Sequence, residues 1–296
     1  MNLLFAYVTV IMIWATTPLA IQWSGHLDWF FGIAARLLIT AGLAIPLVFW
    51  VIKKPFSLHW REVRVYFAAS LGMLGGMTPM YFAAQTMPSG WISLIFGLTP
   101  ILTGVFAFFL LKNFQLSLIK VSGILVSFSG LLVIFLPHLT WHSEKILTGL
   151  AFALVGSSFH SLSTVLVKKY NHGIPSSHIV AGTAWISACA YLIFRPEFLW
   201  QFPQMDLKAL GAIFYLGTVG SLFGFILYYS ILKQLDAVKL GLITLVTPVM
   251  ALLLGHFLNR EPLDGMIIAG ALLVILGLIL FEFGQRLFKR QPLTAV

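Results

Sequence analysis

Long apolar runs separated by short polar segments dominate the chain. A helix that crosses the hydrocarbon core of a bilayer needs about 20 apolar residues, and ten runs satisfy that length. We place them near 3–22, 30–52, 65–86, 90–111, 118–136, 147–167, 178–195, 209–231, 238–258 and 265–284. The pattern predicts an all-α integral membrane protein with ten transmembrane helices and no room for a soluble domain between them.

Composition supports a membrane environment. The chain is 59% hydrophobic and 9% charged, whereas soluble globular proteins carry about 25% charged residues. The net charge of +9 does not indicate nucleic-acid binding, because the basic residues fall in the predicted membrane loops. The single cysteine, Cys189, excludes an intramolecular disulfide framework. The first apolar run has no basic leader and no clear small-residue cleavage site, so we interpret it as a retained span and not as a signal peptide.

The distribution of lysine and arginine predicts the orientation. With the N-terminus inside, thirteen of the 18 basic residues lie in cytoplasmic segments, four lie in outer loops and Arg36 lies within the second span. The positive-inside rule therefore places both termini in the cytoplasm. We expect a multi-pass protein of the cell inner (plasma) membrane.

The sequence contains an internal repeat. The matched pairs, at offsets of 148 and then 147 residues, are Gly72 with Gly220, Gly76 with Gly224, Tyr81 with Tyr229, Thr99-Pro100 with Thr247-Pro248, Gly123 with Gly270 and Gly130 with Gly277. We divide the chain into a first five-helix repeat at 1–137, a second at 146–284 and a cytoplasmic tail at 285–296. Because five is odd, the second copy crosses the membrane in the opposite sense. Inverted repeats of this kind are typical of transporters, with the substrate site near the midplane.

The two Thr-Pro pairs lie at similar depths. Pro100 is twelve residues from Lys112, and Pro248 is twelve from Arg260, which corresponds to about 18 Å of helix in each case. A proline inside a helix removes one backbone donor. A carbonyl freed in this way at mid-membrane is tolerated only against protein or a wet cavity.

The freed carbonyls are predicted to be those of Phe96 and Thr244. We expect each threonine hydroxyl to bond the carbonyl four residues back, at Ile95 and Ile243. The pairs are then either flexible points beside a cavity or simple packing kinks.

The order of these features resembles the EamA-type transporters of the drug/metabolite transporter superfamily. The resemblance lies in YFAAQTMPSGWISLIFGLTPILTGVFAFFL (81–110) with VSGILVSFSGLLVI (121–134), and in YSILKQLDAVKLGLITLVTPVMALLLGHFLNREPL (229–263) with IIAGALLVILGLIL (267–280). It implies a ten-helix inverted repeat with a central cavity lined by helices 1, 3, 4, 6, 8 and 9, and export of metabolites. Second copies in this family commonly carry an acidic residue at the position of Glu261, whereas the first copy here reads KNFQLS (112–117) and has none.

The charged and titratable residues restrict the chemistry. All nine acidic residues fall in loops or at span ends, so the mid-membrane carboxylate expected of a proton-coupled exporter of lipophilic cations is missing. His160 is the best intramembrane titratable group and a possible proton-sensitive residue; the alternative is a neutral imidazole bonded to Ser157 or Thr164. Arg36 is expected to extend its side chain outward to the interface, or else to contact an anion. His256 is expected to be interfacial.

Residues on the spans expected to surround a cavity form the predicted substrate pathway. They are Trp14, Thr17, Tyr81, Thr99, Pro100, Ser157, His160, Tyr229, Thr247 and Pro248. For Trp14, Tyr81 and Tyr229, ordinary core packing is an equal alternative.

No catalytic, nucleotide-binding or metal-binding motif accompanies these residues, so we predict neither an enzyme nor a cofactor or metal site. The predicted function is secondary export of small neutral or zwitterionic metabolites, such as amino acids or their analogues, by alternating access. The alternatives are a drug or toxic-compound exporter on the same scaffold, or a lipid-handling membrane protein. The predicted partners are a small-molecule substrate and the lipid bilayer, with no nucleic acid. Substrate identity, coupling and oligomeric state are left open.

Overall fold

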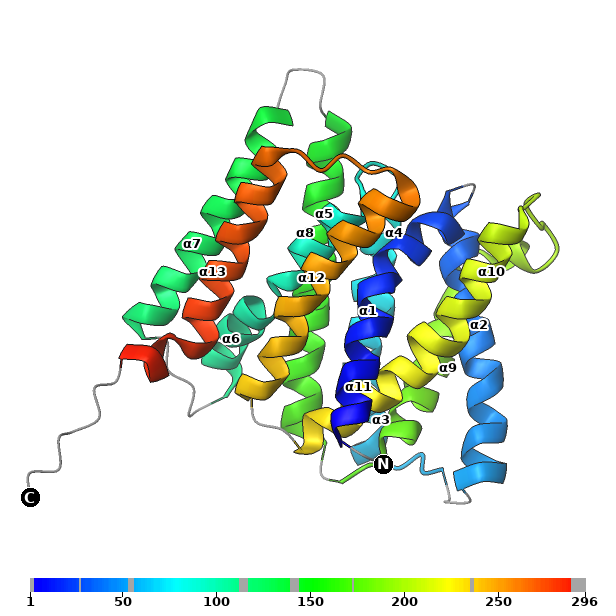
Figure 1. Ribbon diagram of the computed structural model, residues 1–296. Coiled ribbons are helices and arrows are strands. Elements are labelled where there is room, and N and C mark those ends of the chain that lie inside the picture. The colour runs from blue at the N-terminus through cyan, green and yellow to red at the C-terminus, as the bar shows by residue number, and fades with distance from the viewer. Residues whose placement is uncertain are drawn as a thin grey trace, which may run out of the picture.

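The computed structural model describes residues 3–26, 28–52, 56–111, 117–138, 144–171, 173–234 and 237–288, and the regular elements in these ranges are helical (Figure 1). In chain order they are α1 (Leu3–Gly25), α2 (Trp29–Pro46), η1 (Leu47–Ile52), α3 (Trp60–Ser70), η2 (Leu71–Gly76), α4 (Met77–Ala83), α5 (Ser89–Gly97), α6 (Thr99–Leu110), α7 (Leu118–Phe135), η3 (Leu136–His138), α8 (Glu144–Tyr170), α9 (Ser176–Phe194), η4 (Pro196–Leu199), α10 (Leu207–Tyr215), η5 (Leu216–Phe223), α11 (Gly224–Gln234), α12 (Ala237–Asn259) and α13 (Gly265–Phe288).

Eight helices in the described ranges are long and apolar enough to cross a membrane. They coincide with eight of the ten predicted spans, and a shorter apolar helix, Val246–Asn259, coincides with a ninth. The segment predicted at 65–86 is the succession α3, η2 and α4, in which a π-helical stretch interrupts the α-helix. The protein is therefore an all-helical, multi-pass membrane protein.

Carboxylates in the loops cap the helices that follow them. Asp28 accepts hydrogen bonds from the backbone amides of Phe30 and Phe31 at the start of α2. Asp206 caps α10 and Asp264 caps α13 in the same way. Each carboxylate satisfies amide groups that have no partner within their own helix. These acidic residues therefore have a structural role.

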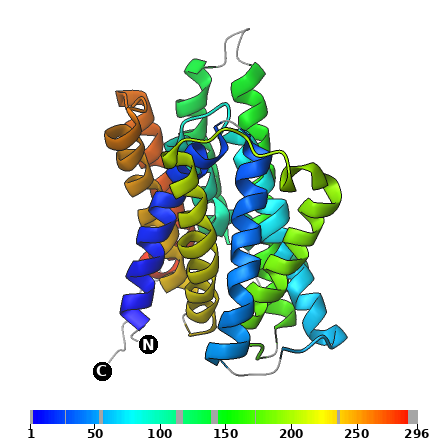
Figure 2. The same cartoon turned by 90° about the vertical axis from the view of Figure 1, so that its right-hand side faces the viewer.

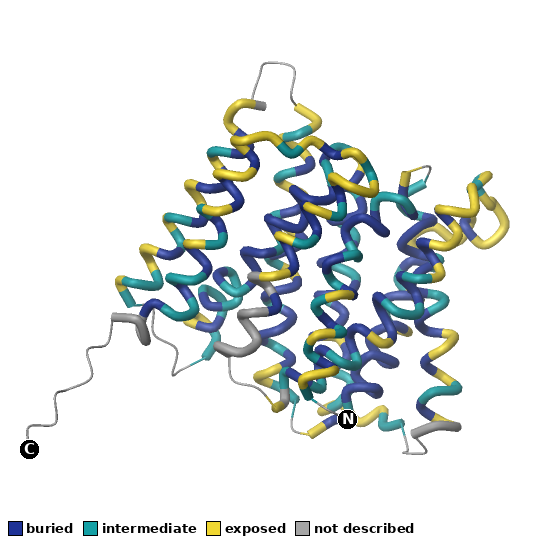
Figure 3. Tube along the Cα trace, in the orientation of Figure 1, coloured by how far each residue is buried: buried dark blue, intermediate teal, exposed yellow. Residues whose placement is uncertain are grey.

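The bundle has two faces, which we name from its ends (Figures 1 and 2). The terminal face is the side on which α1 begins and α13 ends. The far face is the side on which α1 ends and α13 begins. Exposed apolar side chains such as Leu125 and Leu132 on α7 and Leu272 and Leu276 on α13 lie around the outside, and buried positions fill the interior (Figure 3). An apolar exterior of this kind suits contact with lipid.

Helices α7 and α13 pack side by side at one edge of the bundle. A Cβ atom on Gly123 would lie 2.6 Å from the carbonyl oxygen of Gly277, and one on Gly130 would lie 2.6 Å from that of Gly270. The two backbones can approach this closely only because all four positions are glycine.

Two π-helical stretches, η2 and η5, lie in the interior. At Gly217, η5 packs closely against α2. A Cβ atom added to Gly217 would lie 3.0 Å from the carbonyl oxygen of Arg36. The Thr40 hydroxyl donates to the carbonyl of Gly217 at 2.8 Å. Stretches of π-helix leave backbone groups with irregular geometry, and they frequently mark functional sites.

We expect Gly277→Ala to destabilise the bundle, because the added methyl would overlap the carbonyl oxygen of Gly123 at 2.5 Å. Overpacking of this kind costs about 1–3 kcal/mol. Thermal unfolding of the purified protein in detergent measures the change.

Gly42→Ala is the matched control, because Gly42 is also inside a helix but has nothing within 4 Å of an added Cβ. It should unfold at the parental temperature or slightly above, since alanine is the better helix former. Equal stability of the two variants would show that α7 and α13 separate without cost.

Candidate functional site

A cavity of about 460 Å³ lies inside the bundle. Its size is within the range of about 300–1,000 Å³ that is typical of small-molecule sites. Residues from α1, α2, α4, α5, α6, α7, α8, η5, α11, α12 and α13 contribute to its wall. The cavity is the candidate functional site.

The cavity runs from the terminal face toward the far face. Lys168 and Glu282, near the terminal-face ends of α8 and α13, line its mouth, and Lys168 is exposed to solvent. Ile21, Arg36 and Ile92, which are nearer the far face, line the other end. The cavity is thus accessible from the terminal face.

Contacts between helices close the far face. The carboxylate of Glu261 is only 8% exposed. It accepts hydrogen bonds from the Ser89 hydroxyl at 2.7 Å, the Gly90 amide at 3.0 Å and the Asn259 side-chain amide at 3.1 Å. Ser89 and Gly90 begin α5, so the carboxylate also interacts favourably with the N-terminus of that helix. Arg260, with φ of 54°, reverses the chain after α12 and brings Glu261 back into the protein.

A second set of contacts joins α1 to the same region. Trp23 donates its indole N–H to the Asn259 side-chain oxygen at 3.1 Å, and Asn259 donates its amide to Gln22 at 2.8 Å. The Ser24 hydroxyl donates to the Tyr81 hydroxyl at 3.1 Å. These bonds fasten the far-face ends of α1, α4 and α12 together above the cavity.

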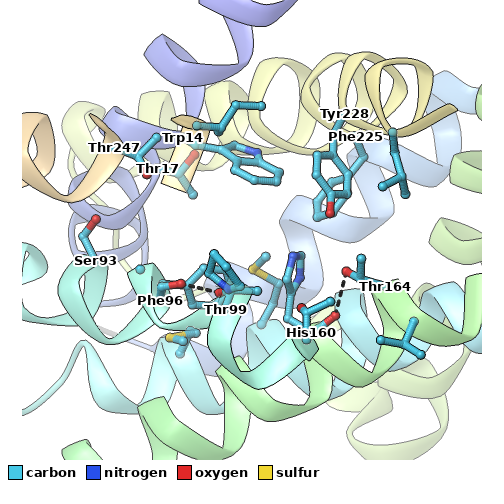
Figure 4. A pocket seen from close by; sticks show the side chains of 18 of the residues that line it. Trp14, Thr17, Ser93, Phe96, Thr99, His160, Thr164, Phe225, Tyr228 and Thr247 are labelled. Atoms are coloured by element: carbon cyan, nitrogen blue, oxygen red, sulfur yellow. Dashed lines mark hydrogen bonds between the residues drawn. The ribbon is translucent and has the colours of Figure 1, made fainter. Parts of the chain in front are cut away.

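Aromatic rings surround the middle of the cavity (Figure 4). The ring of Trp14 lies 4.8 Å from that of Tyr228 and 6.2 Å from that of His160, measured between centroids. Phe96 lies 5.0 Å from His160, and Phe225 lies 6.3 Å from it. The rings come from four helices and form an apolar wall with a few polar edges.

The first Thr-Pro pair breaks its span into two helices beside the cavity. Helix α5 ends at Gly97 and α6 begins at Thr99, with Pro100 in its first turn. The Thr99 hydroxyl donates to the carbonyl oxygen of Phe96, which is the carbonyl that Pro100 leaves without a helical donor. The predicted acceptor, Ile95, was wrong, because the break lets the Ile95 carbonyl accept from the Leu98 amide instead.

Two serines of α8 support the break. Ser157 donates to the Ile95 carbonyl at 3.5 Å, and Ser161 donates to the Thr99 carbonyl at 3.2 Å.

The second Thr-Pro pair has a different geometry, because Pro248 lies inside a helix, α12, that continues from Ala237 to Asn259.

The imidazole of His160 lies against the aromatic wall and is 4% exposed. Its Nδ1 atom is buried and has no hydrogen-bond partner among the described residues. The alternative interpretation, in which the ring is bonded to Ser157 or Thr164, is not what the structure has. Ser157 donates to Ile95, and Thr164 donates to the backbone carbonyl of His160 at 3.0 Å (Figure 4).

Arg36 is buried. The first of the two interpretations from the sequence, that its side chain extends outward to the interface, was therefore wrong. Arg36 is 1% exposed and lines the closed end of the cavity. Its Nε atom donates to the Ser221 hydroxyl at 2.7 Å. Close packing of η5 on α2 covers the path that the side chain would need to follow outward.

The EamA-like transporter family model matches residues 1–136 and 147–283. The chain belongs to this family. Members of this family are transporters.

Two curated relatives and one solved structure illustrate the similarity. The uncharacterized transporter YoaV of Bacillus subtilis is 25% identical over 96% of this chain and 99% of its own length. Protein PecM of Dickeya dadantii is 26% identical over 84% of this chain and 79% of its own. A crystal structure that is 20% identical covers 98% of this chain and 99% of its own, with a TM-score of 0.69. That structure shows the fold alone.

The structure places the predicted pathway residues in two groups. Those that line the cavity are Trp14, Thr17, Thr99, Pro100, His160 and Thr247. Tyr81, Ser157, Tyr229 and Pro248 are buried in the surrounding protein instead. Contact of any of them with a substrate stays a prediction.

Sequence analysis did not single out Phe96 or Phe225. Phe225 and Tyr228 are three residues apart at the start of α11 and therefore share a helical face. That spacing could have predicted that Phe225 lies beside Tyr228 at the cavity. For Phe96, the sequence analysis discussed only the backbone carbonyl and not the ring.

We expect Thr103→Cys, placed in a Cys189→Ser background, to react with a water-soluble maleimide, because Thr103 lines the cavity. Ile101→Cys is the control from the same helix, since Ile101 is 1% exposed. Thiol reactivity depends on access, so the Thr103→Cys protein should react roughly tenfold faster or more. Mass spectrometry of the purified protein in detergent measures both rates. Equal rates would mean that solvent does not fill this part of the cavity.

Proposed function

We propose that the protein is a secondary transporter that exports small neutral or zwitterionic metabolites, such as amino acids or their analogues, by alternating access. The observation that carries the proposal is the shape of the cavity. It is reached from the terminal face, and bonded contacts at Glu261 and Asn259 close it at the far face. A site open to one side of a membrane at a time is the requirement for alternating access.

The proposed architecture is ten transmembrane helices in two inverted five-helix repeats, at 1–137 and 146–284, followed by a cytoplasmic tail at 285–296. The packing of α7 on α13 supports it. Gly123 of the first repeat meets Gly277 of the second, and Gly130 meets Gly270. The sequence offset equates Gly123 with Gly270 and Gly130 with Gly277. A twofold axis between the repeats would therefore convert the Gly123–Gly277 contact into the Gly130–Gly270 contact.

The proposed orientation places the terminal face in the cytoplasm of the cell inner membrane. Thirteen of the 18 basic residues are then cytoplasmic, as the positive-inside rule requires. In this orientation the cavity faces inward and fills with cytoplasmic solutes, which is the loading state that export requires. The six lining residues among the predicted pathway, from Trp14 to Thr247, would contact the substrate.

Export of drugs or other toxic compounds on the same scaffold is the second candidate. The aromatic wall formed by Trp14, Phe225 and Tyr228 favours it, because the faces of such rings stack on flat apolar compounds. We prefer a metabolite as the substrate, because a bare lipophilic cation would need a carboxylate within the cavity to balance its charge. Among the described residues, the carboxylate that lines the cavity is Glu282, and it lies at the mouth.

We expect overexpression of the protein to raise the tolerance of cells to amino-acid analogues more than to lipophilic cationic drugs. Efflux of the same compounds, unchanged, from proteoliposomes that contain purified protein provides the direct measurement. Empty liposomes are the control. Transport of lipophilic cations alone would favour the drug exporter, and chemical change of the compound would indicate an enzyme.

We also expect Pro100→Ala and Pro248→Ala to slow transport while leaving the protein folded. Each substitution restores a backbone donor, and one hydrogen bond contributes about 1 kcal/mol net, which corresponds to a roughly fivefold shift in a conformational equilibrium. If the two sites control opposite gates, maleimide access to Thr103→Cys should rise in one variant and fall in the other.

Pro46→Ala is the matched control, because Pro46 lies inside α2 and outside the cavity wall. It should transport at the parental rate. Parental rates and unchanged access in both the Pro100→Ala and Pro248→Ala proteins would show that these prolines only shape the packing.

A further inference from the structure

The closed end of the cavity contains an arginine that lacks a counter-ion among the described residues. Arg36 is 1% exposed, and the hydroxyl of Ser221 accepts from its Nε atom. Its Nη1 atom is buried and has no hydrogen-bond partner in the described part of the chain. The ion pair between side chains that the structure shows among the described residues, Arg195 with Asp28, lies elsewhere on the far face.

The nearest carboxylate of the cavity wall does not neutralise this charge. Glu282 is the acidic residue that lines the cavity, and it lies seventeen residues along α13 from the far-face start at Gly265, or about 25 Å by helical rise. Arg36 lies seven residues along α2 from its far-face start at Trp29, or about 10 Å. The two charges are therefore at opposite ends of the cavity.

A buried guanidinium in this position favours an anionic ligand. Burying a charge without a partner is costly, and arginine does not lose its proton to escape that cost. With Nε bonded to Ser221, the two terminal amino groups still offer four N–H donors. That planar pair matches the two oxygens of a carboxylate.

The surroundings leave room for such a ligand. Gly220 lines the cavity beside Arg36, and a Cβ atom there would lie 3.7 Å from Nη2. A larger residue would cover the guanidinium. Beyond Arg36 the wall is apolar at Ile21, Met80 and Ile92, and it continues into the aromatic group around Trp14.

We propose that Arg36 binds the carboxylate of the transported metabolite at the closed end of the cavity, with the apolar part of the molecule against the aromatic wall. The inference rests on the proposed transport function and narrows its substrate to small carboxylates, including amino acids. It disfavours compounds that carry only a positive charge. Arg36 is then a specificity-determining residue and not simply a strut between α2 and η5.

The test compares each acid with its own amide, so that the two ligands differ mainly in the negative charge. The probes are phenylalanine with phenylalaninamide, leucine with leucinamide and 3-phenylpropionate with 3-phenylpropionamide. Binding to the purified full-length protein is measured by ligand-induced thermal stabilisation, and transport by exchange in proteoliposomes. We expect the parental protein to prefer at least one acid over its amide by about 30-fold, the range for charge-assisted hydrogen bonds.

Variants then assign the preference to Arg36. Arg36→Gln should remove the acid preference, and Arg36→Lys should retain part of it, because lysine keeps the charge but lacks the planar pair of donors. Arg195→Gln is the matched control, since it removes the same charge from a partly exposed far-face arginine outside the cavity. It should keep the parental preference.

Equal binding of acid and amide by the parental protein would overturn the proposal, as would an unchanged preference in a folded Arg36→Gln protein. If Arg36→Gln does not fold, the acid–amide comparison in the parental protein and in Arg36→Lys tests the proposal, since Arg36→Lys should show a weaker acid preference. Transport of the amides, or of cations, at rates equal to the acids would reject the carboxylate site but keep the transporter. Failure of the parental protein to transport any compound of this panel or of the analogue screen would reject the proposed function itself.

Discussion

The bilayer core contains no water, so each backbone N–H and C=O group of this chain must find its partner within the protein. Regular helices satisfy that requirement automatically, and most of the chain uses them. The exceptions are informative. Where α5 gives way to α6, the freed carbonyl of Phe96 accepts from Thr99, and the adjacent carbonyls of Ile95 and Thr99 accept from serines of α8. The irregular backbone is tolerated because neighbouring side chains complete it.

The same requirement determines where the cavity can form. Backbone groups freed by a break in a helix are tolerated only where they face protein or enclosed solvent. The break before Pro100 and the π-helical stretch η5 both contribute residues to the cavity wall, including Thr99 and Gly220. The regular helices α7 and α13 instead form one edge of the bundle, with leucines such as Leu125 exposed on their outer surface. Local irregularity and the position of the site thus have one physical cause.

Features that depend on local pattern were predictable from the sequence. Apolar runs located most of the spans, and the Thr-Pro pairs marked two places that border the cavity. Features that depend on which neighbour lies opposite were not. Ser157 and Ser161 of α8 bond carbonyls at the break between α5 and α6, where Thr99 donates to Phe96 and not to Ile95. Similarly, nothing in the local sequence shows that η5 covers Arg36.

The carboxylate of Glu261 illustrates the same limit. Its position in a loop after α12 does not indicate burial, yet a turn with Arg260 at positive φ returns it to the interior. There it accepts from the Gly90 amide at the start of α5, which is 171 residues away along the chain. A carboxylate in a loop is therefore not evidence of solvent contact when a helix N-terminus from another part of the chain lies opposite.

Glu261 and Arg36 are both buried charges, and the comparison between them separates a structural role from a binding role. Glu261 has three donors, from Ser89, Gly90 and Asn259, which is close to what its two oxygens can accept in such a site. Its charge is already compensated, and it faces protein. Arg36 has one acceptor, Ser221, and it faces the cavity. A site whose polar groups are fully bonded gains little from a ligand, whereas one with unused donors gains the bonds that the folded chain does not supply. The unused donors of Arg36 therefore support the proposal that a carboxylate of the transported compound binds at this residue.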